Sequence, residues 1–273
     1  MRALRRPLAV LVLWVTAAGS GRAAELSHVW VDEFSEAERA MLVRWTEEAA
    51  AGVEALVGSF PMDVEVHYHR RDGAREPVPW ANTRRGRVQG VHFHVDPGFP
   101  PSAFRRDWTA PHEFAHLVLP YVGRQHAWFA EGFASFMQYR VMTAMGVLSE
   151  EAAAARLRGR LARAARDYDY PDRPFTDAAA RLRAQGRYPV MYWGGAAYFL
   201  QVDEALRSRG SDLIAVLRAY TACCRRSRAR LEDLIAELDG LSGGSVFSAA
   251  LTRFRSEPGF PAVPAAGEAA GRD

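Results

Sequence analysis

Cysteine is scarce in this sequence, which holds only Cys223 and Cys224 among its 273 residues. Two cysteines cannot build a disulfide framework, so a hydrophobic core must stabilise the fold. A bond between adjacent cysteines needs a strained backbone, and the helical spacing of Leu217, Tyr220 and Cys224 indicates instead that Cys224 belongs to the core. For the same reason we do not expect a structural zinc site closed by several cysteines.

Long hydrophobic runs are also missing, because none reaches the roughly 20 residues that span a bilayer as a helix. The apolar stretch PLAVLVLWVTAA follows Arg2, Arg5 and Arg6 and precedes small residues, a pattern typical of a secretory signal peptide. We therefore expect cleavage after Ala23 and export to the periplasm or the extracellular space. No stable membrane insertion is expected after cleavage.

Net positive charge is missing from the expected mature protein. Cleavage would remove four arginines and no acid, which takes the formal net charge of the whole sequence from +3 to −1. Lysine is absent, so all 35 basic side chains are arginines, and they are scattered among acids with which they pair well. Such a chain offers no positive field for nucleic acid, so nucleic-acid binding is not expected.

Alternating patterns in the N-terminal part predict a small sheet. The segments MDVEVHYHRR (62–71) and RVQGVHFHVD (87–96) alternate apolar and polar residues, as half-buried strands do. A loop that contains glycine and proline separates them, and we expect an antiparallel pair with the histidines on a polar face. Ahead of these strands, Ser35 and Glu38 form a capping box that begins a helix.

From Asp107 onward the sequence is almost wholly helical. Glycine and proline mark the ends of the expected helices, which span 109–119, 126–145, 149–167, 191–208, 211–223, 228–239 and 244–255. The predicted fold class is therefore α+β, with a small N-terminal antiparallel sheet and a mostly helical C-terminal part. The expected divisions are a signal peptide (1–23), a sheet-bearing part (24–125), a helical part (126–256) and a disordered tail (257–273).

The motif HEFAH, residues 112–116, has the spacing of a metal-binding helix. His112 and His116 are four positions apart, so on a helix their rings project from the same face and can share a metal ion. Glu113 stands beside them. The alternative is an ordinary amphipathic helix that contains these residues by chance. A chain of this length shows such a pattern by chance roughly one time in a hundred.

A second glutamate favours the metal site. The segment WFAEGFASF follows a short loop, so the chain can reverse and bring Glu131 beside the two histidines. Two histidines and one glutamate would hold one Zn²⁺ ion and leave a fourth position to water, as a catalytic zinc site requires. Gly132 inside a helix costs about 1 kcal/mol relative to alanine, which indicates a close backbone approach at this point.

HEFAH followed by WFAEGFASF resembles the motifs of the gluzincin zinc metallopeptidases. Within this group, the two segments are most similar to those of the aminopeptidase N and glycyl aminopeptidase families. The segment YPVMYWGGAAYFL (188–200) resembles a further helix of those families. In this resemblance Tyr192 falls on the tyrosine that hydrogen-bonds the oxyanion, and Gly195 falls on a glycine. The similarity covers about residues 107–220, and it implies a zincin-like fold in a compact variant.

The resemblance implies a secreted zinc metallopeptidase that acts on a peptide or protein substrate. His112, His116 and Glu131 would hold the metal, and Glu113 would be the general base that activates water. The sequence lacks the glutamate that holds a substrate's free amine in aminopeptidase N, so trimming from the N-terminus is not expected. Two alternatives stay open: a non-catalytic binding or assembly module with this fold, and a zinc hydrolase that acts on a non-peptide amide or ester. The pattern does not predict an oligomeric state.

Overall fold

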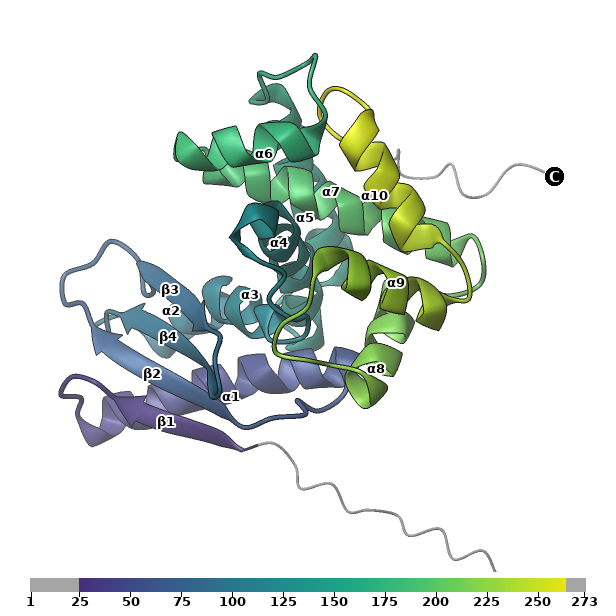
Figure 1. The fold of residues 1–273 in the computed structure, drawn as a ribbon. Coiled ribbons are helices and arrows are strands. Elements are labelled where there is room, and N and C mark those ends of the chain that lie inside the picture. Colours follow the sequence, from purple (N-terminus) through teal and green to yellow (C-terminus); the bar gives the residue numbers. More distant parts are fainter. Residues whose placement is uncertain (1–24, 264–273) are drawn as a thin grey trace, which may run out of the picture.

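The computed structural model describes residues 25–263, so the predicted signal peptide and the end of the predicted tail lie outside the described residues. The N-terminal part holds a four-stranded sheet and one long helix, and the rest is helical (Figure 1). The N-terminal elements are β1 (Leu26–Trp30), α1 (Glu36–Val57), β2 (Val64–Arg70), β3 (Trp80–Arg84) and β4 (Gln89–Val95). The helices that follow are α2 (Pro101–Arg106), α3 (Thr109–His116), the 3-10 helix η1 (Arg124–His126), α4 (Ala127–Ala144), α5 (Glu150–Arg166), α6 (Phe175–Ala184), α7 (Tyr188–Arg207), α8 (Leu213–Cys223), α9 (Leu231–Ser242) and α10 (Val246–Ser256).

The sheet is mixed, and the prediction of an antiparallel sheet was wrong. Its strand order is β1-β2-β4-β3; β1, β2 and β4 run parallel, and only β3 runs antiparallel to β4. The segment between β2 and β4 is long enough to return to the start of the sheet, so β4 enters beside β2 in the same direction. It also contains β3, which pairs with the outer edge of β4. Alternation of apolar residues predicts which face is buried, but it does not predict strand direction.

The two faces of the sheet have different surroundings, as the alternation predicted. Tyr68 and Phe93 are fully buried on the inner face, where the Tyr68 hydroxyl lies 2.7 Å from Thr46 Oγ1 of α1. On the opposite face the rings of His67 and His92 stack with centroids 4.3 Å apart. None of the sheet histidines lines the cleft described below.

The capping box of α1 is present and is extended by an ion pair. The Glu38 backbone N–H donates to Ser35 Oγ at 3.3 Å, the Ser35 N–H donates to Glu38 Oε2 at 2.7 Å, and Arg70 donates to both Glu38 oxygens. The hydrogen bond from Arg70 is the main reason that the pKa of Glu38 is lowered to about 2. This network joins the start of α1 to the end of β2.

The lowered pKa of Glu38 predicts acid sensitivity. A carboxyl group whose pKa is lowered in the folded state stabilises the fold at pH values above its ordinary pKa of 4.5. This contribution is lost as the pH falls through about 2. We expect Glu38→Gln to remove this part of the pH dependence, measured as urea midpoints between pH 5 and about 2. Glu36→Gln in the same helical turn is the matched control, and an equal effect of both substitutions would contradict the assignment.

The helical part agrees closely with the sequence pattern. Each predicted helix is present with its ends shifted by up to three residues, whereas α2 and α6 were not predicted because they are short and begin beside prolines. In Figure 1, α4 and α7 lie at the centre of this part, and α5, α6 and α10 pack against α7. Among the described residues, no helix combines the length and the apolar character needed to cross a bilayer.

Cys223 and Cys224 are joined by a disulfide bond, although the strain of a bond between adjacent cysteines had made this the less expected arrangement. Cys223 ends α8, and Cys224 has left the helical conformation with φ −135° and ψ −3°, which allows the neighbouring sulfurs to bond. Cys224 packs partly against the hydrophobic core, as its spacing indicated. Helical periodicity could not predict the bond because it assumes that the helix continues through both residues.

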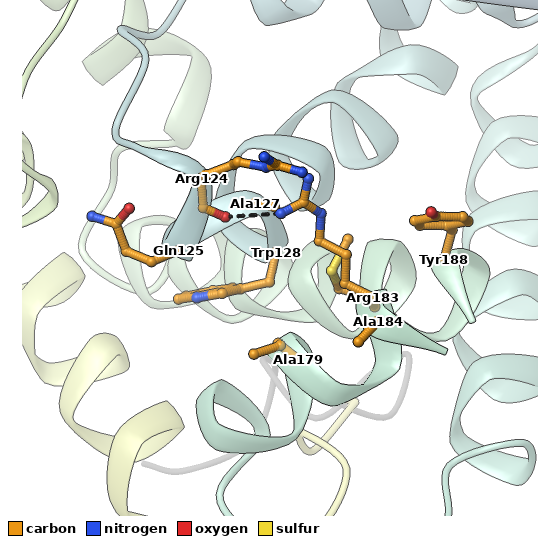
Figure 2. A pocket seen from close by; sticks show the side chains of 10 residues that line it. Arg124, Gln125, Ala127, Trp128, Ala179, Arg183, Ala184 and Tyr188 are labelled. Carbon is orange, nitrogen blue, oxygen red and sulfur yellow. Dashed lines mark hydrogen bonds between the residues drawn. The ribbon is translucent and has the colours of Figure 1, made fainter. Parts of the chain in front are cut away.

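A pocket of about 410 Å³ opens where η1, α4, α6 and α7 meet (Figure 2). Trp128, Ala179 and Met191 form part of its wall, and each of them is almost fully buried. Arg124 and Arg183 lie along it, and Arg183 Nη1 donates to the backbone oxygen of Arg124 at 3.4 Å. The same two arginines also line the cleft at the HEFAH helix.

Candidate metal centre

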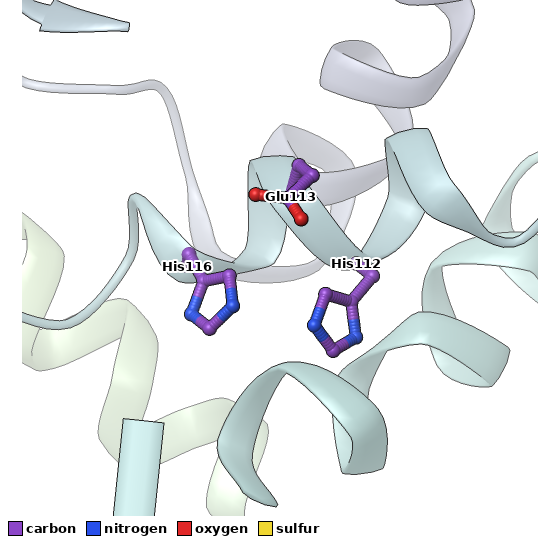
Figure 3. A group of neighbouring side chains, drawn as sticks. All are labelled: His112, Glu113 and His116. Atoms are coloured by element: carbon purple, nitrogen blue, oxygen red, sulfur yellow. The ribbon is translucent and has the colours of Figure 1, made fainter. Parts of the chain in front are cut away.

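Helix α3 carries the HEFAH motif in a buried position between the sheet and α4. The backbone N–H of Thr109 donates to Asp107 Oδ1 at 2.8 Å, which satisfies one of the free N–H groups in the first turn. His112 and His116 project from one face of the helix with ring centroids 4.8 Å apart, and Glu113 lies beside them (Figure 3). All three side chains are buried, at 2 %, 8 % and 8 % exposed for His112, Glu113 and His116 respectively.

Two arginines satisfy the carbonyl groups at the end of α3. Arg85 donates to the backbone oxygens of His116 and, at 2.8 Å, of Leu119. Arg225 donates to the backbone oxygen of Leu117 at 2.8 Å. Cationic donors at a helix C-terminus also interact favourably with its dipole. These contacts fix the point at which the chain leaves α3 and turns toward α4.

Glu131 on α4 returns to the two histidines. Its Oε2 atom lies 3.3 Å from His112 Nε2 and 3.5 Å from His116 Nε2. Burial alone would raise the pKa of the Glu131 carboxyl, but the charge of His116 and hydrogen bonds to both imidazoles hold it well below its ordinary range. The pKa of His112 is raised, because hydrogen bonding to Glu131 and its charge outweigh burial.

Two donor sets for a divalent ion are therefore available. The ligand atoms of His112, Glu113 and His116 lie within 4.8 Å of one another, so Glu113 could also be a ligand. However, Glu113 Oε2 already accepts a hydrogen bond, whereas one Glu131 oxygen approaches both Nε2 atoms. Two imidazoles and one carboxylate from Glu131 make the donor set typical of a catalytic zinc site, and this set leaves Glu113 uncoordinated.

Gln138 orients the first histidine and was not predicted from the sequence. Its Oε1 atom lies 3.0 Å from His112 Nδ1 and can accept the Nδ1 proton, which would leave Nε2 for a metal ion. Gln138 is buried and lies seven residues after Glu131, on the same face of α4. That spacing is a sequence signal that could have identified it.

Thr83 is a second residue that sequence reasoning missed. Its hydroxyl donates to Glu113 Oε2 at 2.7 Å. Thr83 belongs to β3, the edge strand beside α3, and the sequence pattern had assigned this segment to a loop. A hydroxyl that donates to one carboxylate oxygen leaves the other oxygen of Glu113 available to the cleft.

Tyr192 lies on α7 at the same cleft. Its ring stacks against that of His112 with centroids 6.1 Å apart, and the two residues line the cleft with Glu131. Burial, followed by the nearby charges of Glu131 and Glu113, raises the pKa of the Tyr192 hydroxyl above its ordinary value. The hydroxyl therefore stays protonated and can donate a hydrogen bond at any physiological pH.

The position of Tyr192 depends on a close crossing of α4 and α7. Gly132, next to Glu131, lies against Gly195, and a Cβ atom on Gly132 would come within 2.5 Å of the Gly195 Cα atom. The close approach expected from Gly132 is confirmed. It lets the backbones of the two helices touch, which brings Glu131 and Tyr192 to one cleft of about 490 Å³.

Two solved structures are similar to this chain over most of its length. One is a point mutant of a two-domain M1 zinc metallopeptidase bound to L-arginine, with a TM-score of 0.52 and 16 % identity over 89 % of this chain and 50 % of that one. The other is a mutant M1 zinc metallopeptidase from Deinococcus radiodurans, with a TM-score of 0.50 and 17 % identity over 89 % of this chain and 51 % of that one. The fold is similar to that of M1 zinc metallopeptidases.

This similarity is limited to the fold because the sequence identity is low. The chain spans about half the length of those proteins. No protein-family model matches the sequence, and comparison with curated proteins gives no match either. The predicted α+β class with a mostly helical C-terminal part agrees with this fold once the sheet is corrected to a mixed one. Which gluzincin family is nearest stays a prediction.

Proposed function

We propose that this protein is a zinc metallopeptidase of the gluzincin type. The observation that carries the proposal is the convergence of one Glu131 oxygen on the Nε2 atoms of both His112 and His116. The donor set fits zinc, since two neutral imidazoles and a carboxylate leave a coordination position open. A zinc ion there would supply a Lewis acid that makes water reactive near neutral pH and polarises a peptide carbonyl.

The residues around this site have the chemistry that peptide hydrolysis needs. Glu113 takes the proton from the attacking water and transfers it to the leaving amine nitrogen. Tyr192 keeps its proton and donates a hydrogen bond to the oxygen on which negative charge develops; losing one such donor typically costs about 10²–10³ in rate. The fold similarity to M1 zinc metallopeptidases supports a peptide substrate.

Metal analysis tests the proposed centre. We expect purified protein to hold about one equivalent of zinc, and Glu131→Gln to lose most of it because the shared carboxylate ligand is gone. Glu113→Gln is the matched control and is expected to retain zinc. Retention by Glu131→Gln together with loss in Glu113→Gln would instead identify Glu113 as the ligand, and absence of zinc from the wild type would favour a binding module.

Thr83 is expected to position the general base. We expect Thr83→Val to lower kcat by about tenfold with little change in KM, because one hydrogen bond to the charged Glu113 is lost. Thr83→Ser keeps the hydroxyl and should retain most of the activity. If the serine variant is as slow as the valine variant, the hydroxyl is not the group that matters.

We also propose that the protein is exported, since its first 23 residues have the pattern of a signal peptide. Expression of the full chain followed by fractionation and N-terminal sequencing tests this. Mature protein that begins near Ala24 outside the cytoplasm is the expected result. Intact chain in the cytoplasm, still starting at Met1, would contradict it.

A further inference from the structure

The metal cleft and the side pocket of Figure 2 are neighbours that share lining residues. Arg124, Ala127 and Arg183 line both hollows, so the two arginines lie at the border between them. The cleft measures about 490 Å³ and the pocket about 410 Å³. A substrate bound in the cleft would therefore lie beside these arginines.

The side pocket is positively charged, and the cleft is not. Two of the ten residues that line the pocket are arginines and none is an acid, whereas in the cleft Glu76, Glu113 and Glu131 balance Arg85 and the same two arginines. The Arg183 guanidinium donates to the backbone oxygen of Arg124, and Figure 2 shows the side chains of these two arginines close together. Two neighbouring cations with no acid among the pocket residues make a site for an anion.

Both guanidinium groups lack an acidic partner. In the part of the chain that the structure describes, no carboxylate lies within 4.0 Å of Arg124 or Arg183, although Arg187, four residues after Arg183, pairs with Asp169. Arg140 and Arg207, by comparison, both pair with Asp203. The five N–H donors of a guanidinium fit a carboxylate in two parallel hydrogen bonds, so this pair suits a carboxylate supplied from outside.

The wall behind the arginines sets the shape of what binds. Trp128, Ala179 and Met191 are each no more than 3 % exposed and present apolar surface to the pocket. A charged group cannot be buried against such a wall without a partner, so the carboxylate has to lie at the arginines while its aliphatic part contacts the wall. Short acidic side chains and a terminal carboxylate both have this form.

We propose that Arg124 and Arg183 form a subsite that binds a carboxylate of the substrate, so that the enzyme prefers peptides carrying an acidic group near the cleaved bond. The proposal rests on the proposed peptidase function and names its substrate class. An acidic side chain and the peptide's C-terminal carboxylate share this chemistry.

The test uses four synthetic peptides of one parent sequence: neutral with an amidated C-terminus, neutral with a free C-terminus, and glutamate-containing or glutamine-containing with an amidated C-terminus. We expect wild-type kcat/KM to be at least about tenfold higher for one or both carboxylate peptides than for their neutral counterparts. The double variant Arg124→Gln/Arg183→Gln should remove that preference, measured as the ratio of kcat/KM between each carboxylate peptide and its neutral counterpart.

Arg181→Gln is the matched control, since Arg181 is exposed on the same helix α6 and does not line the pocket. It should keep the wild-type preference. If kcat/KM is higher only for the peptide with a free C-terminus, the subsite binds the chain end. If kcat/KM is higher only for the glutamate peptide, the subsite binds an acidic side chain. A wild type without preference, or a preference that survives in the double variant, overturns the proposal.

A binding measurement separates this proposal from the proposed function. The same peptides, fluorescently labelled, are titrated into Glu113→Gln with and without the two arginine substitutions, and anisotropy gives the Kd. Weaker binding of the carboxylate peptides by about tenfold in the arginine-substituted protein supports the subsite even if the wild type cleaves nothing. Cleavage without any dependence on the arginines leaves the peptidase function intact and rejects the subsite.

Discussion

Glu113→Gln is expected to lower kcat/KM for peptide cleavage by about a thousandfold. The amide is nearly isosteric with the carboxylate but cannot take a proton from water, and a positioned general base contributes roughly 10²–10⁴ to the rate. Thr83 can still donate to the amide oxygen, so the side chain should keep its place. Steady-state kinetics on a mixture of blocked and unblocked peptides gives the rates and separates cleavage within a chain from removal of its ends.

The control for this experiment is the metal content of the same preparation. If the variant is inactive but its zinc content and its melting temperature are unchanged, it has lost the base alone. Cleavage of peptides by Glu113→Gln at the wild-type rate would remove Glu113 as base. If the protein hydrolyses simple esters or non-peptide amides but no peptide, the proposed metal chemistry stands and the proposed substrate class is wrong.

The geometry of the HEFAH site could be predicted from the sequence because its parts are close in the chain. His112 and His116 share a helix face by their spacing alone, and Glu131 follows within one helix-loop-helix unit whose short loop forces the chain to reverse. Local periodicity also predicted most of the helices. For these features, residues that are close in the sequence are also close in space, so the local pattern is sufficient to predict them.

The parts that could not be predicted depend on pairing between distant segments. Thr83 contacts Glu113 only because β3 pairs with the outer edge of β4, and nothing in the alternation of 62–71 and 87–96 indicates a parallel β2-β4 pair. Arg183 reaches the cleft from α6, which the pattern did not predict. Residues that reach a site from distant elements are therefore harder to identify than those of the HEFAH motif itself.

Gly132→Ala is expected to lower the free energy of unfolding by about 3 kcal/mol. The added methyl group would overlap the backbone of Gly195, which cannot rotate away as a flexible side chain can, so α4 and α7 must separate. Because Glu131 precedes Gly132 and Tyr192 lies one turn before Gly195, the separation should also weaken zinc binding and slow catalysis. Urea denaturation and zinc titration measure the two effects on one sample.

Gly159→Ala is the matched control, because Gly159 lies exposed inside α5 with open space where its Cβ would be. There the same substitution should stabilise the protein by about 0.5–1 kcal/mol, since alanine favours a helix more than glycine does. Opposite signs at the two positions isolate the cost of separating the helices from the helical preference of the residue. Stabilisation by Gly132→Ala as well would mean that α4 and α7 do not touch through their backbones, and the position of Glu131 beside the histidines would then need another cause.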